Sequence, residues 1–106
     1  MTKPSICVFC GSRTGNAPTY AEAARATGRA IAESGFRLVY GAGDVGLMGE
    51  VAAAAIAAGA PTLGVIPVHL LNRERQLRDM TSIIVTEDMH ERKKVMFMNS
   101  DAIVVL

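Results

Sequence analysis

Short runs of apolar residues alternate along the chain with longer segments in which apolar positions recur every three or four residues. Runs that are apolar at nearly every position are typical of strands covered on both faces of a parallel sheet. The longer spacing is typical of helices that pack on such a sheet. The pattern predicts strands at Ile6–Cys10, Phe36–Tyr40, Thr62–Ile66, Ser82–Thr86 and Ala102–Leu106.

Local signals mark the helices expected between these strands. A capping box, Thr19-x-x-Glu22, starts the first helix, and Gly35 ends it as a left-handed cap. Its inner face is expected to consist of the residues at helical spacing: Tyr20, Ala23, Ala24, Thr27 and Ile31. A second helix is expected over Leu47–Ala58, and a short helix or ordered loop over the polar segment His69–Asp79. A third helix is expected over Met89–Asn99, after the capping pattern Asp88-x-x-Glu91.

The alternation of strands and helices predicts the fold. It implies a parallel sheet joined by right-handed crossovers. With 106 residues, the chain is one domain at most. We therefore predict an α/β fold, a Rossmann-like doubly wound parallel sheet of about five strands, with residues 1–106 as a nucleotide-binding domain. Ligands bind such sheets at the carboxyl ends of the strands, where four turns collect: Gly11–Ser12, Gly41–Gly46, the segment from Pro67, and Glu87–Lys93.

The glycine-rich turn after the second predicted strand is a candidate anion site. Gly41, Gly43 and Gly46 have the spacing G-x-G-x-x-G between a strand and a helix. Glycine lets the backbone approach a ligand closely, and the N–H groups of a helix start face a bound phosphate. An NAD site would need an acidic residue after the next strand, and Val65–Val68 has none. The turn favours a mononucleotide or sugar phosphate, although the third glycine could serve only helix–strand packing.

Positive charges occupy the first turns of the third predicted helix. Arg92, Lys93 and Lys94 lie there, although cations oppose the helix dipole at that end by about 0.3–1 kcal/mol each. A bound phosphate would remove this penalty and give Arg92 a bidentate partner. The alternative is a solvated charged face, which we expect for Lys94. Glu74, after the third strand, is either a surface carboxylate or an acceptor for a ribose hydroxyl or a base.

Composition narrows the class of protein. The net charge of +1 gives no broad electrostatic footprint for nucleic acid. The first apolar run is too short for a signal peptide and no later run is long enough to span a membrane, which favours a cytoplasmic protein. Cys7 and Cys10 form C-x-x-C, but in a strand they point to opposite faces, so we expect two buried residues rather than a redox pair. No other cysteine exists to complete a zinc site.

The motifs Cys10-Gly11-Ser12, Tyr40–Gly49, Gly64–Pro67 and Met89–Lys93, with Ser100–Ala102, resemble those of the LONELY GUY family. The resemblance covers the whole chain in order. It implies a cytokinin riboside 5′-monophosphate phosphoribohydrolase, working as a homodimer or larger homo-oligomer. Such an enzyme hydrolyses the N-glycosidic bond of AMP or its N6-modified analogues and releases the base and ribose 5-phosphate. It uses neither a metal nor an organic cofactor.

The resemblance also implies roles for individual residues. Arg92 corresponds to the catalytic arginine. The implied substrate-binding residues are Gly11, Ser12, Gly41, Gly43, Gly46, Glu74, Met89, Arg92 and Lys93. One departure is Ala42, which replaces the family's middle glycine and which we expect to be tolerated.

A second departure concerns the family's P-G-G-x-G-T-x-x-E motif, which carries a phosphate loop and the catalytic glutamate and would follow Leu106. Either the chain is a fragment of a longer protein or it is a truncated form without the chemistry. Two other functions stay open: a non-catalytic nucleotide or sugar-phosphate binding module, and an interaction protein whose Val51–Ala58 helix makes a dimer contact or packs on the sheet. We expect the 106 residues alone to be marginally stable, associating and inactive, with Val104, Val105 and Leu106 uncovered.

Overall fold

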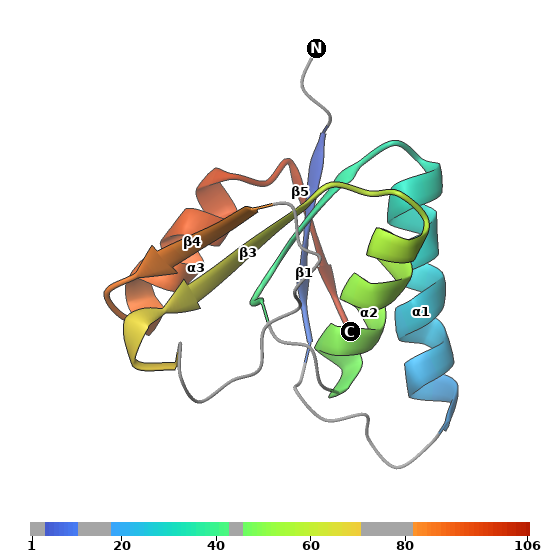
Figure 1. The fold of residues 1–106 in the computed structure, drawn as a ribbon, viewed down its shortest axis with the longest axis horizontal. Helices are drawn as coiled ribbons and strands as arrows, with labels where there is room; N and C mark the ends of the chain where they lie inside the picture. The colour runs from blue at the N-terminus through green and yellow to red at the C-terminus, as the bar shows by residue number, and fades with distance from the viewer. Residues whose placement is uncertain (1–3, 11–17, 43–45, 71–81) are drawn as a thin grey trace.

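The computed structural model describes residues 4–10, 18–42, 46–70 and 82–106. The five predicted strands and the helices expected at the first, second and third helical segments are present, with ends that differ by one or two residues from those expected. The segment expected at His69–Asp79 lies outside the described residues from position 71 onward. In chain order the elements are β1 (Ser5–Phe9), α1 (Pro18–Glu33), β2 (Arg37–Tyr40), α2 (Gly46–Ala57), β3 (Thr62–Pro67), the 3-10 turn η1 (Val68–Leu70), β4 (Ser82–Thr86), α3 (Met89–Met98) and β5 (Ala102–Val105) (Figure 1).

The five strands form one parallel sheet in the order β4-β3-β2-β1-β5. From β1 the chain proceeds to β4 at one edge and then returns, so that β5 pairs with the other side of β1. In this register Cys7 has Val39 of β2 on one side and Ile103 of β5 on the other. The predicted Rossmann-like α/β fold is confirmed, and its strand order reverses between β1 and β5. Open α/β sheets bind their ligands outside the carboxyl ends of the strands at such a reversal.

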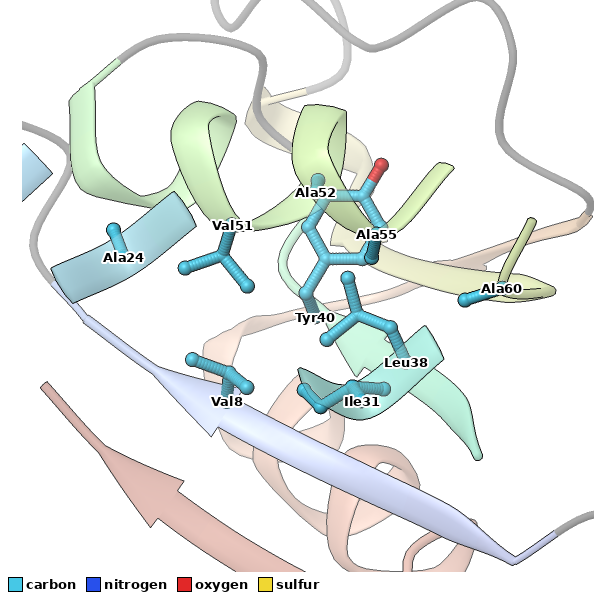
Figure 2. Close-up of a cluster of buried hydrophobic side chains, with 9 residues drawn as sticks. All are labelled: Val8, Ala24, Ile31, Leu38, Tyr40, Val51, Ala52, Ala55 and Ala60. Atoms are coloured by element: carbon cyan, nitrogen blue, oxygen red, sulfur yellow. The ribbon is translucent and has the colours of Figure 1, made fainter. Parts of the chain in front are cut away.

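Helices α1 and α2 lie side by side on one face of the sheet (Figure 1). Figure 2 shows the apolar cluster between them and the sheet, in which β2 supplies the large side chains and α2 supplies mainly alanines. Its buried members are Val8, Ala24, Ile31, Leu38, Tyr40, Val51, Ala52, Ala55 and Ala60. The alanine-rich helix therefore packs on the sheet and on α1, which was one of the two interpretations of this segment.

The close approach of the two helices occurs at Gly28, which is buried. A Cβ atom on Gly28 would overlap the carbonyl oxygen of Val51 and lie 3.0 Å from both the Ala54 Cβ and the Ala55 N. Only glycine fits there without displacing α2, because two of these three atoms belong to the backbone of α2. The small residues of the two helices thus determine how closely they pack.

The buried stripe of α1 runs through Ala24, Gly28 and Ile31, at spacings of four and three residues. The expected inner face was therefore partly wrong, because Tyr20 is 56% exposed and Ala23 is also exposed. Contact with α2 at Gly28, rather than the apolar character of each residue, decides which side of α1 is covered. The predicted capping box at Thr19 was wrong as well, since α1 already begins at Pro18.

Helix α3 covers the other face of the sheet (Figure 1). The cluster beneath it consists of Cys7, Val39, Leu63, Val65 and Met96. Cys10 instead packs against the first cluster, so the two cysteines do lie on opposite faces as expected. They are free thiols.

Strand β5 forms one edge of the sheet and is incompletely covered. Ile103 and Val105 are 47% and 76% exposed, and Leu106 is 41% exposed. Val104 points to the opposite face and packs against the first cluster, so the expectation that it would be uncovered was wrong. The alternation of side chains along a strand explains this difference between neighbours.

Candidate functional site

Arg92 lies at the carboxyl-end edge of the sheet, one turn into α3. The helix begins where predicted, because the Asp88 side chain accepts a hydrogen bond from the N–H of Glu91 at 2.7 Å and caps the helix. Side chains on a helix lean toward its N-terminus, and this direction brings the Arg92 guanidinium to the ends of β2 and β3. The cap at Asp88 thus fixes the position from which Arg92 reaches the sheet.

The guanidinium of Arg92 is held by two backbone carbonyls, one within β3 and one directly after the end of β2. Nε donates a hydrogen bond to the carbonyl oxygen of Val65 at 2.8 Å, and Nη2 donates to the carbonyl oxygen of Gly41. Nη1 lies 3.7 Å from the sulfur of Met89, a weak acceptor. Arg92 is only 8% exposed, so it does not belong to a solvated charged face. Away from water, such a cation interacts strongly with an anion.

Lys93 and Lys94 follow Arg92 on the helix but are exposed. For Lys94 this confirms the expected solvated position. Lys93 lines a pocket together with Arg92, and Lys94 does not. The structure therefore separates the three neighbouring cations into a buried one, one at the rim of a pocket and one in solvent.

The pocket beside Arg92 has a volume of about 150 Å³ and lies between the carboxyl end of β1, the start of α2 and α3. Among the residues that the structure describes, its lining consists of Val8, Phe9, Cys10, Gly41, Met48, Met89, Arg92, Lys93 and Met96. The lining is mainly apolar. An apolar cavity of this size holds a group about as large as benzene, so the pocket suits one part of a nucleotide rather than the whole molecule.

The structure brings together four of the predicted site residues, because Gly41, Met89, Arg92 and Lys93 all line this pocket. Gly46 is described but is not among the lining residues. The remaining predictions lie outside the residues that the structure describes: Gly11, Ser12, Gly43 and Glu74. Their roles stay predictions.

Sequence reasoning missed Met48 and Met96 as pocket residues. Met96 is four residues after Arg92 and therefore lies on the same face of α3, which the helical spacing could have revealed. Met48 belongs to the G-L-M-G element that was used only to establish the resemblance. Methionine side chains adapt to irregular apolar surfaces and make favourable contacts with aromatic rings, so both fit the wall of a ligand pocket.

Two described residues of the glycine-rich turn have a positive φ. Gly46 has a φ of +67°, in the left-handed region that favours glycine. Ala42 has a φ of +68° and is fully buried. A non-glycine residue in this conformation costs about 1–2 kcal/mol of conformational free energy. Alanine in place of the family's glycine is therefore a less mild change than expected.

The two cysteine thiols are not poised for chemistry at neutral pH. Burial raises the pKa of Cys10 to about 11. Burial also raises the pKa of Cys7, and a hydrogen bond with Ser100 offsets part of this increase. Because the thiolate is the reactive form, neither group is activated. Among the described residues, no group of three or more His, Cys, Asp or Glu side chains could hold a metal ion.

Comparison with known proteins identifies the family. Residues 3–106 match the SLOG cluster4 family. The chain belongs to this family. It is 45% identical over 101 residues to the cytokinin riboside 5′-monophosphate phosphoribohydrolase LOG7 of Arabidopsis thaliana, a match that covers 95% of this chain and 46% of the relative. It is 42% identical over 106 residues to an enzyme of the same name from Rhodococcoides fascians, with 99% and 54% covered.

These relatives confirm the resemblance to the LONELY GUY family. The chain spans about half the length of the curated relatives it matches. The SLOG chain is also similar to the molybdenum cofactor binding protein of Rippkaea orientalis, with a TM-score of 0.83, 27% identity, and coverage of 99% of this chain and 63% of that one. The Moco carrier protein of Chlamydomonas reinhardtii gives a TM-score of 0.82 at 27% identity, with 97% and 62% covered.

Within the SLOG chain, no helix in the described ranges is long and apolar enough to cross a membrane.

Proposed function

We propose that the protein hydrolyses the N-glycosidic bond of AMP or of N6-modified (cytokinin) nucleoside 5′-monophosphates and releases the free base and ribose 5-phosphate. The observation that carries this proposal is the identity of 42–45% to phosphoribohydrolases of that name over nearly the whole chain. The buried cation beside a small apolar pocket supports it, because such a substrate combines an anion with a flat and largely apolar base.

The chemistry assigns Arg92 the central role. As the base leaves, positive charge builds up on the ribose, as in other glycoside hydrolysis. A carboxylate is needed to stabilise this charge or to activate water. Arg92 binds the phosphate or polarises the substrate, because its guanidinium is held in place by two carbonyls. Lys93, at the rim of the pocket, provides a second positive charge.

The remaining site residues complete the proposal. Glu74 accepts a hydrogen bond from the ribose or the base, and the turns at Gly11–Ser12 and Gly43–Gly46 surround the phosphate, next to Gly41 beside Arg92. Met89 contacts the ligand from the start of α3, where it lines the pocket. We further propose that the whole protein is a cytoplasmic homodimer or larger homo-oligomer.

The direct test is to incubate the full-length protein with AMP and with an N6-alkylated AMP and to quantify free base and ribose 5-phosphate by chromatography. Arg92→Ala should lower the rate by about 10²–10³-fold, the scale for loss of one preorganised electrostatic group. Lys94→Ala is the matched control, because it removes an exposed cation from the same helix and should leave the rate unchanged. Binding of AMP without release of adenine would contradict the enzyme and favour a non-catalytic binding module.

A further inference from the structure

Gly41 lies directly against the guanidinium of Arg92. A Cβ atom on Gly41 would overlap Nη2 of Arg92 and would lie 3.1 Å from its Cζ and 3.0 Å from Cε of Met48. The backbone does not require glycine here, because Gly41 is absent from the described residues with positive φ, which include Gly35 and Gly46. The reason for glycine at this position is therefore the space that Arg92 occupies.

Among the described residues, Gly41 also supplies one of two backbone oxygens that accept hydrogen bonds from the guanidinium. The plane of a guanidinium holds its donors in a fixed arrangement. Hydrogen bonds from Nε to Val65 and from Nη2 to Gly41 therefore fix both the position and the rotation of that plane. Val65 is within β3 and Gly41 directly follows β2, so the guanidinium bridges β3 and the turn after β2. The loss of either bond would remove one of the constraints on this plane.

We propose that Gly41 is a positioning residue for Arg92 in the reaction. It leaves room for the guanidinium and accepts its hydrogen bond, and it acts on the substrate through Arg92 rather than by direct approach of its own backbone. This inference rests on the proposed function of Arg92. It differs from the role that the glycine spacing suggested, in which Gly41 itself surrounds a bound phosphate.

The first experiment compares Gly41→Ala with Gly35→Ala in the full-length protein. Both obstacles to the new methyl group at residue 41 are ends of flexible side chains, so the protein should fold and Arg92 should move. We expect kcat/KM for AMP to fall about 10²-fold, the scale for misplacing a catalytic group by about 1 Å. A Cβ on Gly35 meets no atom within 4 Å, but its φ is +76°. Gly35→Ala should therefore lower stability and leave kcat/KM unchanged.

A double-mutant cycle separates positioning from direct ligand contact. If Gly41 acts through Arg92, adding Gly41→Ala to Arg92→Ala should lower kcat/KM by less than about threefold, because the interaction is already lost. Added guanidinium chloride should partly restore the activity of Arg92→Ala, since the space beside Gly41 is then empty. It should not restore that of the double variant, where the methyl group fills part of this space. Independent, multiplicative losses would overturn the inference.

A measurement that does not depend on enzymatic activity tests the role of Gly41 separately from the proposed function. In ¹⁵N NMR spectra, the Nε–H of Arg92 should exchange slowly with water, because it is bonded to Val65. Exchange should be accelerated at least tenfold in Gly41→Ala and unchanged in Gly35→Ala. If the unsubstituted protein releases no adenine from AMP, the proposed function fails and the exchange rates still decide the role of Gly41. Equal exchange in the unsubstituted protein and Gly41→Ala would overturn the positioning role.

Discussion

Replacing Gly28 by alanine tests the packing of α1 on α2, because intrinsic propensity and tertiary packing predict opposite signs. Alanine is the best helix former, and this change in a helix interior stabilises by about 0.8–1.0 kcal/mol where the side chain is free. At Gly28, however, the new methyl group would overlap the carbonyl oxygen of Val51 and crowd Ala55 N at 3.0 Å. These are backbone atoms, so a side-chain rotation cannot relieve the clash and α2 must shift as a body.

The magnitude follows from the two opposing terms. Inserting a methyl group into a well-packed core costs about 1–3 kcal/mol, and a rigid backbone obstacle favours the upper half of that range. A gap of 0.5–1 Å between helices also forfeits roughly a quarter to a half of each dispersion contact across it. Subtracting the gain in helix propensity leaves a net loss of about 1–2 kcal/mol in the free energy of unfolding.

The assay is equilibrium unfolding in urea of the full-length protein and the Gly28→Ala variant. We expect a lower midpoint with an unchanged slope, because the surface exposed on unfolding stays the same. Ala30→Gly is the matched control, since Ala30 is exposed on the same helix and this change removes propensity alone, about 1 kcal/mol. If Gly28→Ala were instead stabilised by the full propensity gain, the close contact of the helices would be wrong.

Three further changes have expected outcomes. Arg92→Lys should weaken AMP binding by about 1–3 kcal/mol in calorimetry, because a single ammonium cannot bridge the two carbonyls that hold the guanidinium; unchanged affinity would contradict this. Asp101→Ala should lower the free energy of unfolding in urea by about 1 kcal/mol, because its Oδ2 accepts a partly buried hydrogen bond from Ser5 N at 2.8 Å. An unchanged midpoint would show that this bond is dispensable. Since burial raises the pKa of Cys10 from 9.0 to about 11, its alkylation by iodoacetamide at pH 8, followed by mass spectrometry, should be about 10²-fold slower in the folded protein than in urea. The raised pKa means that the Cys10 thiol holds its proton more tightly in the folded protein than in the unfolded one. The contribution of this group to the free energy of unfolding is therefore present below pH 9 and is lost between pH 9 and 11. Equal alkylation rates in the folded and unfolded protein would show that the thiol is not protected.

The elements that the sequence predicted correctly are those with local causes. Asp88 caps α3 by bonding an N–H three residues away, and the strands follow from apolar runs. The inner side of α1 depends on the contact of Gly28 with α2, which no local signal reveals. The error at Tyr20 has this origin, since an amphipathic pattern does not state which neighbouring element will cover it.

For the candidate site, too, the sequence predicted the local features but not the contacts between distant residues. Strand alternation and helix position predicted that the turn at Gly41 and the start of the helix with Arg92 meet at one edge of the sheet. The roles of Met89 and Lys93 came from the family resemblance and stay predictions. The acceptors of Arg92 were not predictable, because the two carbonyls belong to residues 27 and 51 positions away in the chain. A guanidinium that bonds to backbone leaves no residue-type signal at its partner except the absence of a side chain at Gly41.

Strand β1 lies inside the sheet, between β2 and the edge strand β5, and this position has a consequence for how the protein is made. Its pairing with β2 begins when residue 37 is available, yet its other edge waits for β5, and Ser5 and Asp101 are separated by 96 positions. At roughly 5–20 residues per second on the ribosome, this interval lasts about 5–20 s. During that time an apolar strand edge is open to pairing with other nascent chains. Molecules that shield strand edges during synthesis should therefore raise the yield of folded protein more than changes that only stabilise the finished sheet.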